Sequence, residues 1–128
     1  MNKIAIPAEQ GDVTLIQASI DVEILKGKKR RRAEGGRVIL ARGETTGHHH
    51  SLSAGNSYVV EADGQLQALF NAQVGAPEKG NLLSGVLVVK RPDPFEHTEH
   101  AAIEIAPGIH WVVIEQEYSP AEIRRAID

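Results

Sequence analysis

The chain has 128 residues, the usual size of one domain, so we expect a single β domain over residues 1–128. Hydrophobic residues make up 41% and charged residues 24%, which argues against a disordered tail protein and against a membrane protein. The formal net charge of -3 gives no overall attraction to nucleic acid or acidic membranes, and the lack of cysteine excludes disulfides, thiolate metal sites and cysteine nucleophiles.

The first half of the chain places apolar residues at period two, which is typical of β-strands. It opens with MNKIAIPAEQGDV, which lacks the apolar run of a signal peptide, so we expect a cytoplasmic protein without membrane contact. Strands are predicted over residues 13–16, 20–24, 38–40 and 58–60, with turns at Gly35-Gly36 and Gly55-Asn56.

The second half continues the same pattern. Strands are predicted over residues 65–70, 86–89, 103–105 and 111–114, with turns at 63–64, 80–81 and 107–108. Ser119, Pro120 and Glu122 form a helix-start signal, which predicts a short C-terminal helix. We therefore predict a mainly β protein, a single-domain sandwich or a jelly-roll-like barrel whose strands are joined by hairpins.

Six of the 14 basic residues fall in one short run around Gly27, namely Lys26, Lys28, Lys29, Arg30, Arg31 and Arg32. Their mutual repulsion and the absence of apolar side chains predict a solvated loop or hairpin tip. Such a loop could hold phosphates of nucleic acid or another polyanion by charge alone, or it could be an exposed loop without a ligand. Both interpretations stay open.

The six histidines occur in three places, and this grouping is the main chemical signal. His48, His49 and His50 are consecutive. On a strand, His48 and His50 share one face while His49 points to the other, so the first two could bind one metal ion. His97 and His100 lie at the entrance of a later strand. We therefore predict a metal site formed by His48, His50, His97 and His100, and leave His110 out of it.

Two glutamates are candidates for catalytic support of this site. Glu44 lies four residues before His48, and Glu99 stands between His97 and His100. A carboxylate could orient an imidazole or act as general base toward a metal-bound water. Imidazole and carboxylate ligands suit zinc, iron, manganese, nickel or copper(II), and the alternative is a polar face whose histidines and glutamates only hydrogen-bond each other.

Two resemblances follow from these segments. The His48-x-His50 strand, the Asp63-Gly64 turn and the later Ala106-Pro107-Gly108 turn resemble a small cupin or related jelly roll. This resemblance implies a metal held inside the barrel by three histidines and a glutamate. The segments GETTGHHH (43–50) and HTEHAAIEIAPG (97–108) are similar to a group of small uncharacterised bacterial and phage-encoded proteins, which implies no activity.

The leading hypothesis is a small metal-binding β protein; if it is an enzyme, its metal would support a hydrolytic or lyase reaction on an unknown small molecule. The alternatives are a non-catalytic polyanion-binding module that uses the basic run at residues 26–32, and an assembly protein that forms a homo-oligomer. Whether the protein is an enzyme is left open by the sequence.

Overall fold

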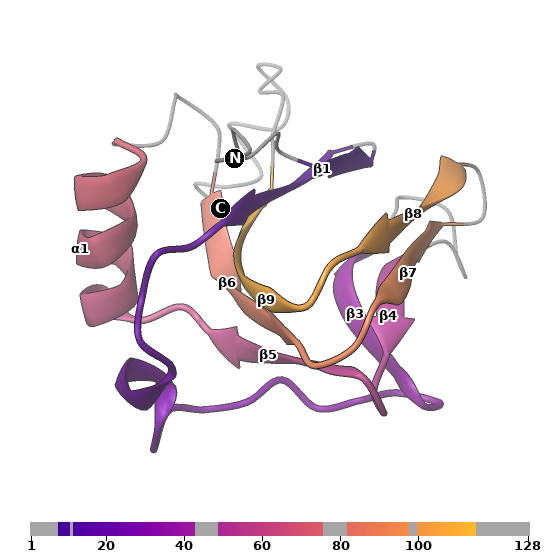
Figure 1. Ribbon diagram of the computed structural model, residues 1–128, viewed down its shortest axis with the longest axis horizontal. Helices are drawn as coiled ribbons and strands as arrows, with labels where there is room; N and C mark the ends of the chain where they lie inside the picture. The colour runs from indigo at the N-terminus through magenta and orange to yellow at the C-terminus, as the bar shows by residue number, and fades with distance from the viewer. Residues whose placement is uncertain (1–7, 11, 43–48, 76–81, 98–99, 115–128) are drawn as a thin grey trace, which may run out of the picture.

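The computed structural model describes residues 8–10, 12–42, 49–75, 82–97 and 100–114, which form two antiparallel sheets (Figure 1). The five-stranded sheet has the order β1-β2-β9-β6-β5, and the four-stranded sheet has the order β3-β4-β7-β8. The prediction of a mainly β sandwich is confirmed, and the described strands do not close into a barrel. The strands are β1 (Ala8–Gln10), β2 (Val13–Gln17), β3 (Arg37–Arg42), β4 (His49–Ser53), β5 (Ser57–Glu61), β6 (Leu82–Val89), β7 (Asp93–His97), β8 (His100–Ile105) and β9 (Gly108–Ile114).

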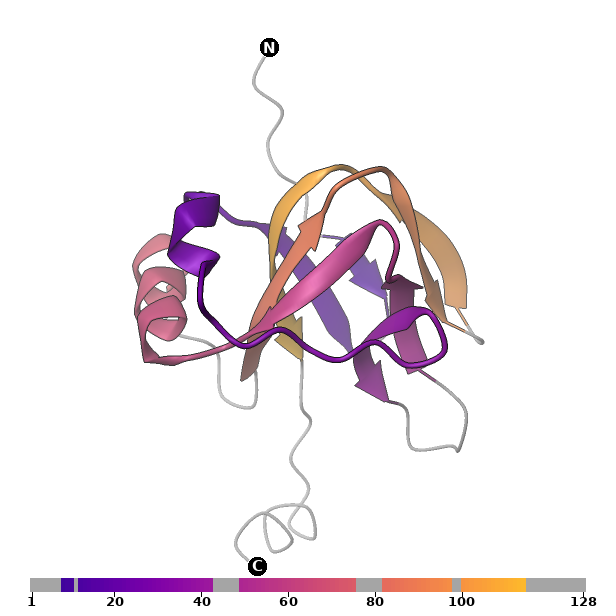
Figure 2. The same ribbon diagram turned by 90° about the horizontal axis from the view of Figure 1, so that it is seen from below.

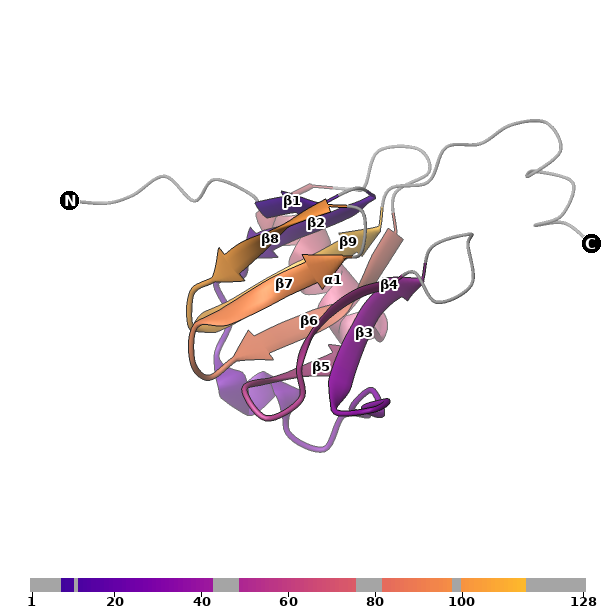
Figure 3. The same ribbon diagram turned by 90° about the vertical axis from the view of Figure 1, so that its right-hand side faces the viewer.

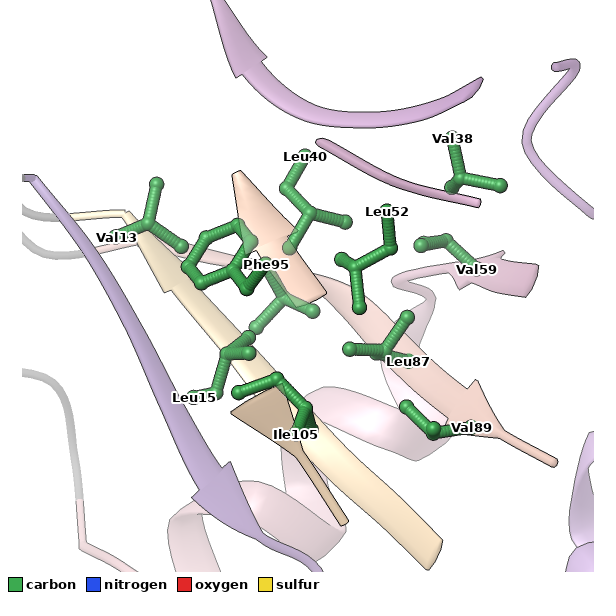
Figure 4. Packing of buried hydrophobic residues seen from close by; sticks show 11 residues of the cluster. Val13, Leu15, Val38, Leu40, Leu52, Val59, Leu87, Val89, Phe95 and Ile105 are labelled. Atoms are coloured by element: carbon green, nitrogen blue, oxygen red, sulfur yellow. The ribbon is translucent and has the colours of Figure 1, made fainter. Parts of the chain in front are cut away.

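The main core lies between the two sheets (Figure 3). Figure 4 shows its side chains pointing toward one another from both sheets. They alternate with outward residues because successive side chains of a strand point to opposite faces. The fully buried Phe95 of β7 is the largest side chain of this core. The other members are Val13, Leu15, Val38, Leu40, Leu52, Val59, Leu87, Val89, Ile105 and Val112.

A second apolar layer covers the outer face of the five-stranded sheet. The helix α1 (Gly64–Gln73) and the short 3-10 helix η1 (Val22–Leu25) lie side by side on this face (Figure 2). Phe70 of α1 packs edge-to-face on the fully buried Trp111 of β9, with ring centroids 5.5 Å apart. The five-stranded sheet is therefore buried on both faces over much of its length, which explains why β6 and β9 are nearly continuous apolar runs.

The predicted strand over residues 65–70 is wrong, because this segment belongs to α1. Leu66 and Phe70 are four residues apart, a spacing that suits one face of a helix as well as one face of a strand. The decision comes from Asp63, whose side chain accepts a hydrogen bond of 2.9 Å from the Leu66 amide. Asp63 is therefore a helix N-cap, and the predicted turn at residues 63–64 is wrong as well.

The Asp63 cap predicts a measurable stability loss. Asp63→Ala leaves the Leu66 amide without its acceptor and removes the ion pair with Lys28, so we expect a loss of about 1 kcal/mol in unfolding free energy. Asp63→Asn keeps a capping oxygen and should lose less than half of that. Urea unfolding followed by circular dichroism compares the two variants, and equal stability of Asp63→Ala and the parent would contradict the cap.

The predicted strand over residues 20–24 is also wrong. Residues 22–25 form η1, and Asp21 is its N-cap. The Asp21 carboxylate accepts a 2.9 Å hydrogen bond from the Glu23 amide. This turn brings Leu25 under the sheet with only 5% of its surface exposed, while Val22 stays exposed. The alternation of apolar residues in this segment therefore reflects one turn of 3-10 helix packed on the sheet.

The predicted turns have mixed outcomes. Gly35 and Gly36 form the predicted tight turn, and their φ angles of 57° and 76° require glycine. The turns at 55–56 and 107–108 also exist, but each joins strands of different sheets, so the expected hairpins are wrong there. The turn at 80–81 and the C-terminal helix lie outside the described residues. Within the described part of the chain, no helix has the length and apolar character to span a membrane.

Candidate functional site

His50 lies on the inward face of β4 together with the core residue Leu52. Only 6% of its surface is exposed, and its ring centroid is 5.8 Å from that of Phe95. An imidazole is polar at both nitrogens, so burial of this kind is costly unless hydrogen bonds or a metal satisfy them. His50 is therefore the buried polar group around which the site is built.

Gln10 of β1 binds His50 across the gap between the two sheets. Gln10 is even more buried than His50, with 3% of its surface exposed, and its Nε2 donates a 2.9 Å hydrogen bond to the Phe95 carbonyl. That contact turns Oε1 toward His50, where it lies 2.9 Å from Nδ1. An amide oxygen only accepts, so Nδ1 of His50 must carry the hydrogen. In the neutral ring, Nε2 is then the nitrogen that carries the lone pair.

The strand pairing places the backbone positions of His97 and His100 near that of His50. Strands β4 and β7 are antiparallel and pair through Ser51 and Glu96. His50 precedes Ser51 and His97 follows Glu96, so the two histidines occupy neighbouring positions at the same end of this pair. Strand β7 pairs with β8, with His97 opposite His100. Three histidines thus occupy neighbouring positions on three adjacent strands, and β1 contacts β8 at the same edge of the sandwich.

The remaining predicted site residues have no described position. Glu44, His48 and Glu99 lie outside the described residues, and for His97 and His100 the structure describes the strand positions and not the side chains. Among the side chains that are described, no group of three histidine, aspartate or glutamate residues is close enough to hold a metal ion. The structure therefore brings His50, His97 and His100 together at the level of the backbone.

His49 points away from this site, toward the outer face of the four-stranded sheet. Its Nδ1 atom is buried and has no hydrogen-bond partner among the described residues. On the same face Arg37 donates to the Ser51 hydroxyl at 3.1 Å and forms an ion pair with Glu96 at 3.1 Å. The opposite orientations of His49 and His50 follow from strand alternation, and they make His49 the natural comparison for His50.

His110 lies elsewhere in the sandwich. On β9 it pairs with Gln17 at the far end of β2, whereas Gln10 pairs with Val13 at the near end. Its Nε2 is 3.1 Å from the Ala106 carbonyl. Burial lowers the pKa of His110 below its ordinary value, and the hydrogen bond to Ala106 opposes this only in part. His110 is therefore neutral at neutral pH and remains apart from the site around His50.

The comparison with protein families decides where this sequence belongs. The family described as "Domain of unknown function (DUF8820)" matches residues 9–116. The chain belongs to the DUF8820 family. The matched range contains Gln10 and both histidine segments of this DUF8820 domain. Searches of curated proteins and of solved structures give no significant match.

In this DUF8820 domain the basic run is only partly the solvated loop that the sequence predicts. Lys29, Arg30 and Arg32 are exposed, but Lys28 and Arg31 retain only 15% and 19% of their side-chain exposure. The expectation of a solvated loop is thus wrong for those two residues, which are partly buried. Lys28 pairs with Asp63, and Arg31 binds Glu61 in the seam between the two sheets.

Gln10 and Arg31 are the two important polar residues that sequence reasoning missed or misjudged. Gln10 is the last residue of a three-residue strand, and its role depends on Phe95, 85 positions later. Arg31 looks like any other member of the basic run. The local signal that Arg31 differs from its neighbours is its position between the exposed Arg30 and Arg32. This position indicates an inward side chain only once residues 29–31 are known to pair with β5.

Proposed function

We propose that this protein binds a divalent transition metal ion, with His50 as the first ligand and His97 and His100 as further ligands. The observation that supports this most strongly is the hydrogen bond between Gln10 and His50. A metal-binding histidine usually donates its second ring N–H to a neighbouring acceptor, and Gln10 is such an acceptor. Gln10 is itself held by the 2.9 Å hydrogen bond from its Nε2 to the Phe95 carbonyl, so its amide oxygen is kept in place opposite Nδ1 of His50.

The positions of the strands support the same proposal. Side chains directly opposite one another on antiparallel strands have Cβ atoms about 5 Å apart, which suits imidazoles that share one ion. His97 and His100 are such a pair, and His50 is on the next strand. His48, two residues before His50, is expected on the same face and completes the predicted set.

Nitrogen and oxygen ligands of this kind suit zinc, iron, manganese or nickel. When bound, such a metal would polarise a substrate oxygen or lower the pKa of a water, which is the chemistry of hydrolases and lyases. Glu44 and Glu99 are the candidates for the general base, and the substrate would be a small molecule. The inward position of His50, between two sheets, agrees with the resemblance to cupins, whose metal also lies inside the sandwich.

Isothermal titration calorimetry with zinc and nickel salts tests the metal site. The protein is purified without a nickel column and treated with chelator. We expect one ion per chain for the parent protein and for His49→Ala, whose side chain faces the other way. His50→Ala should bind at least about tenfold more weakly, because it loses a ligand. Gln10→Leu should weaken binding by about tenfold as well, because Nδ1 of His50 loses its acceptor.

His50 and Gln10 are buried, so their replacement could disturb folding. The variants His97→Gln and His100→Gln avoid replacing either buried residue, and they should also weaken metal binding. Circular dichroism before titration shows that each variant is folded. Equal zinc and nickel affinity in the parent and in all four variants at positions 10, 50, 97 and 100 would refute the proposal, as would absence of binding in the parent.

A further inference from the structure

A positively charged surface lies on the opposite edge of the molecule, where the basic run pairs with β5. Arg30 forms an antiparallel bridge with Val60, flanked by two hydrogen bonds, from the Arg31 amide to the Val59 carbonyl and from the Glu61 amide to the Lys29 carbonyl. The backbone of the run is therefore held beside β5, the edge strand of the five-stranded sheet, at this one bridge.

Two exposed cations of this surface, Arg30 and Lys90, lie over one tyrosine, and a third, Arg32, follows two residues after Arg30. The guanidinium carbon of Arg30 stacks 3.9 Å from the centroid of the Tyr58 ring, and Nζ of Lys90 lies 5.6 Å from the same centroid. Arg32 is exposed like Arg30, whereas Arg31 between them is partly buried.

Acidic side chains do not neutralise this cluster among the described residues. Glu61, the last residue of β5, is paired with Arg31, and Asp63, two residues later, is paired with Lys28. No ion pair within the described part of the chain involves Arg30, Arg32 or Lys90. The surface therefore keeps a local positive charge although the whole chain has a net charge of -3.

We propose that Arg30 and Lys90, which lie over Tyr58, and Arg32 bind the phosphate backbone of a single-stranded nucleic acid. Proteins that bind single strands combine a positive surface with aromatic or guanidinium planes on which bases stack. Both components are present here, since the Arg30 guanidinium already lies over the Tyr58 ring. The proposal differs from that of a basic loop at residues 26–32, because Lys28 and Arg31 are excluded and Lys90, the residue after β6, is included. It is also independent of the metal site.

Fluorescence anisotropy with a labelled oligothymidylate of about 20 nucleotides tests this surface at about 50 mM and about 200 mM salt. Arg30→Gln combined with Arg32→Gln should weaken binding about tenfold at the lower salt concentration. It should also reduce the slope of log affinity against log salt by about 1.4, which is about 0.7 for each lost phosphate contact. Tyr58→Leu should weaken binding about tenfold with an unchanged slope, because it removes stacking and no charge.

The control removes two charges elsewhere. Lys26 and Arg42 have 74% and 60% of their side chains exposed, and each is paired with a glutamate, so Lys26→Gln with Arg42→Gln changes the net charge equally. We expect the control to bind within about twofold of the parent. Equal weakening by the two double variants would overturn the proposal, as would no binding by the parent, or tighter binding to a duplex of the same length or to heparin.

Discussion

Gly85→Ala is expected to lower the free energy of unfolding by about 3 kcal/mol, because the new methyl group has no space. A Cβ atom at this position would lie far inside van der Waals contact with the Val60 carbonyl oxygen and 3.1 Å from Cγ1 of Val59. The neighbour is the backbone of β5, which is held on both sides by hydrogen bonds. Relief of the clash therefore requires β5 and β6 to separate.

The crowding at Gly85 has a cause in the strand pairing. The register between β6 and β9 shifts between Leu83 and Gly85, so Ser84 is an extra residue in β6. A bulge of this kind bends the strand and increases its twist, which brings the backbone at Gly85 close to β5. The glycine is required by the close approach of two backbones and not by an unusual φ angle.

Urea unfolding measures the effect, and Gly64→Ala is the matched control. Gly64 begins α1, and a Cβ atom there meets no atom within 4 Å, so that variant should be as stable as the parent or slightly more stable. For Gly85→Ala we expect a melting temperature lower by about 12 °C. A loss of less than about 1 kcal/mol would show that β5 and β6 separate easily at this point, contrary to the expectation.

The strands could be predicted where β-branched residues form runs bounded by turn formers. Residues 111–114 and 86–89 are examples, and both lie in central strands of the five-stranded sheet. Prediction failed where two periods coincide. Leu66 and Phe70 fit a strand and a helix equally, and only the hydrogen bond between the Asp63 side chain and the Leu66 amide separates the two.

The candidate site could be predicted only as a set of histidines. The His50 position follows from alternation within a strand, which is local information. The role of Gln10 depends on β1 lying across from β4 and β7, and such long-range pairing leaves no mark in the residues near Gln10. The same holds for Lys90, the residue after β6, which lies near Tyr58 because β6 pairs with β5, and local patterns do not reveal this pairing.

The polar residues that join the two sheets are single long side chains on opposite seams. Gln10 reaches from β1 in the five-stranded sheet to Phe95 and His50 in the four-stranded sheet. Arg31 reaches from the run beside β5 to β3, where it donates to the Ile39 and Leu40 carbonyls. Open edges of a sandwich leave carbonyl and amide groups unpaired, and these two side chains satisfy some of them.

Arg31→Ala is expected to lower the free energy of unfolding by about 2 to 3 kcal/mol. The guanidinium group donates to the Glu61 carboxylate, to the Ser84 hydroxyl at 3.0 Å and to the Ile39 carbonyl at 3.1 Å. Ser84 is the extra residue of the β6 bulge, and the β3 register shifts next to Ile39, so Arg31 binds backbone irregularities of both sheets. Its removal leaves the Glu61 charge and these carbonyls without their donor.

Comparison of Arg31→Lys with Arg31→Ala separates the effect of the planar guanidinium group, which donates in several fixed directions, from the effect of the positive charge. Arg31→Lys keeps the charge but cannot donate in several fixed directions, so we expect it to lose about half as much stability as Arg31→Ala. Arg42→Ala removes an exposed ion pair with Glu34 and should change stability by less than about 0.5 kcal/mol. Urea unfolding of the three variants decides the role of Arg31. If Arg31→Ala loses no more stability than Arg42→Ala, water replaces the guanidinium contacts. The apolar core alone would then hold the seam between β3 and β5.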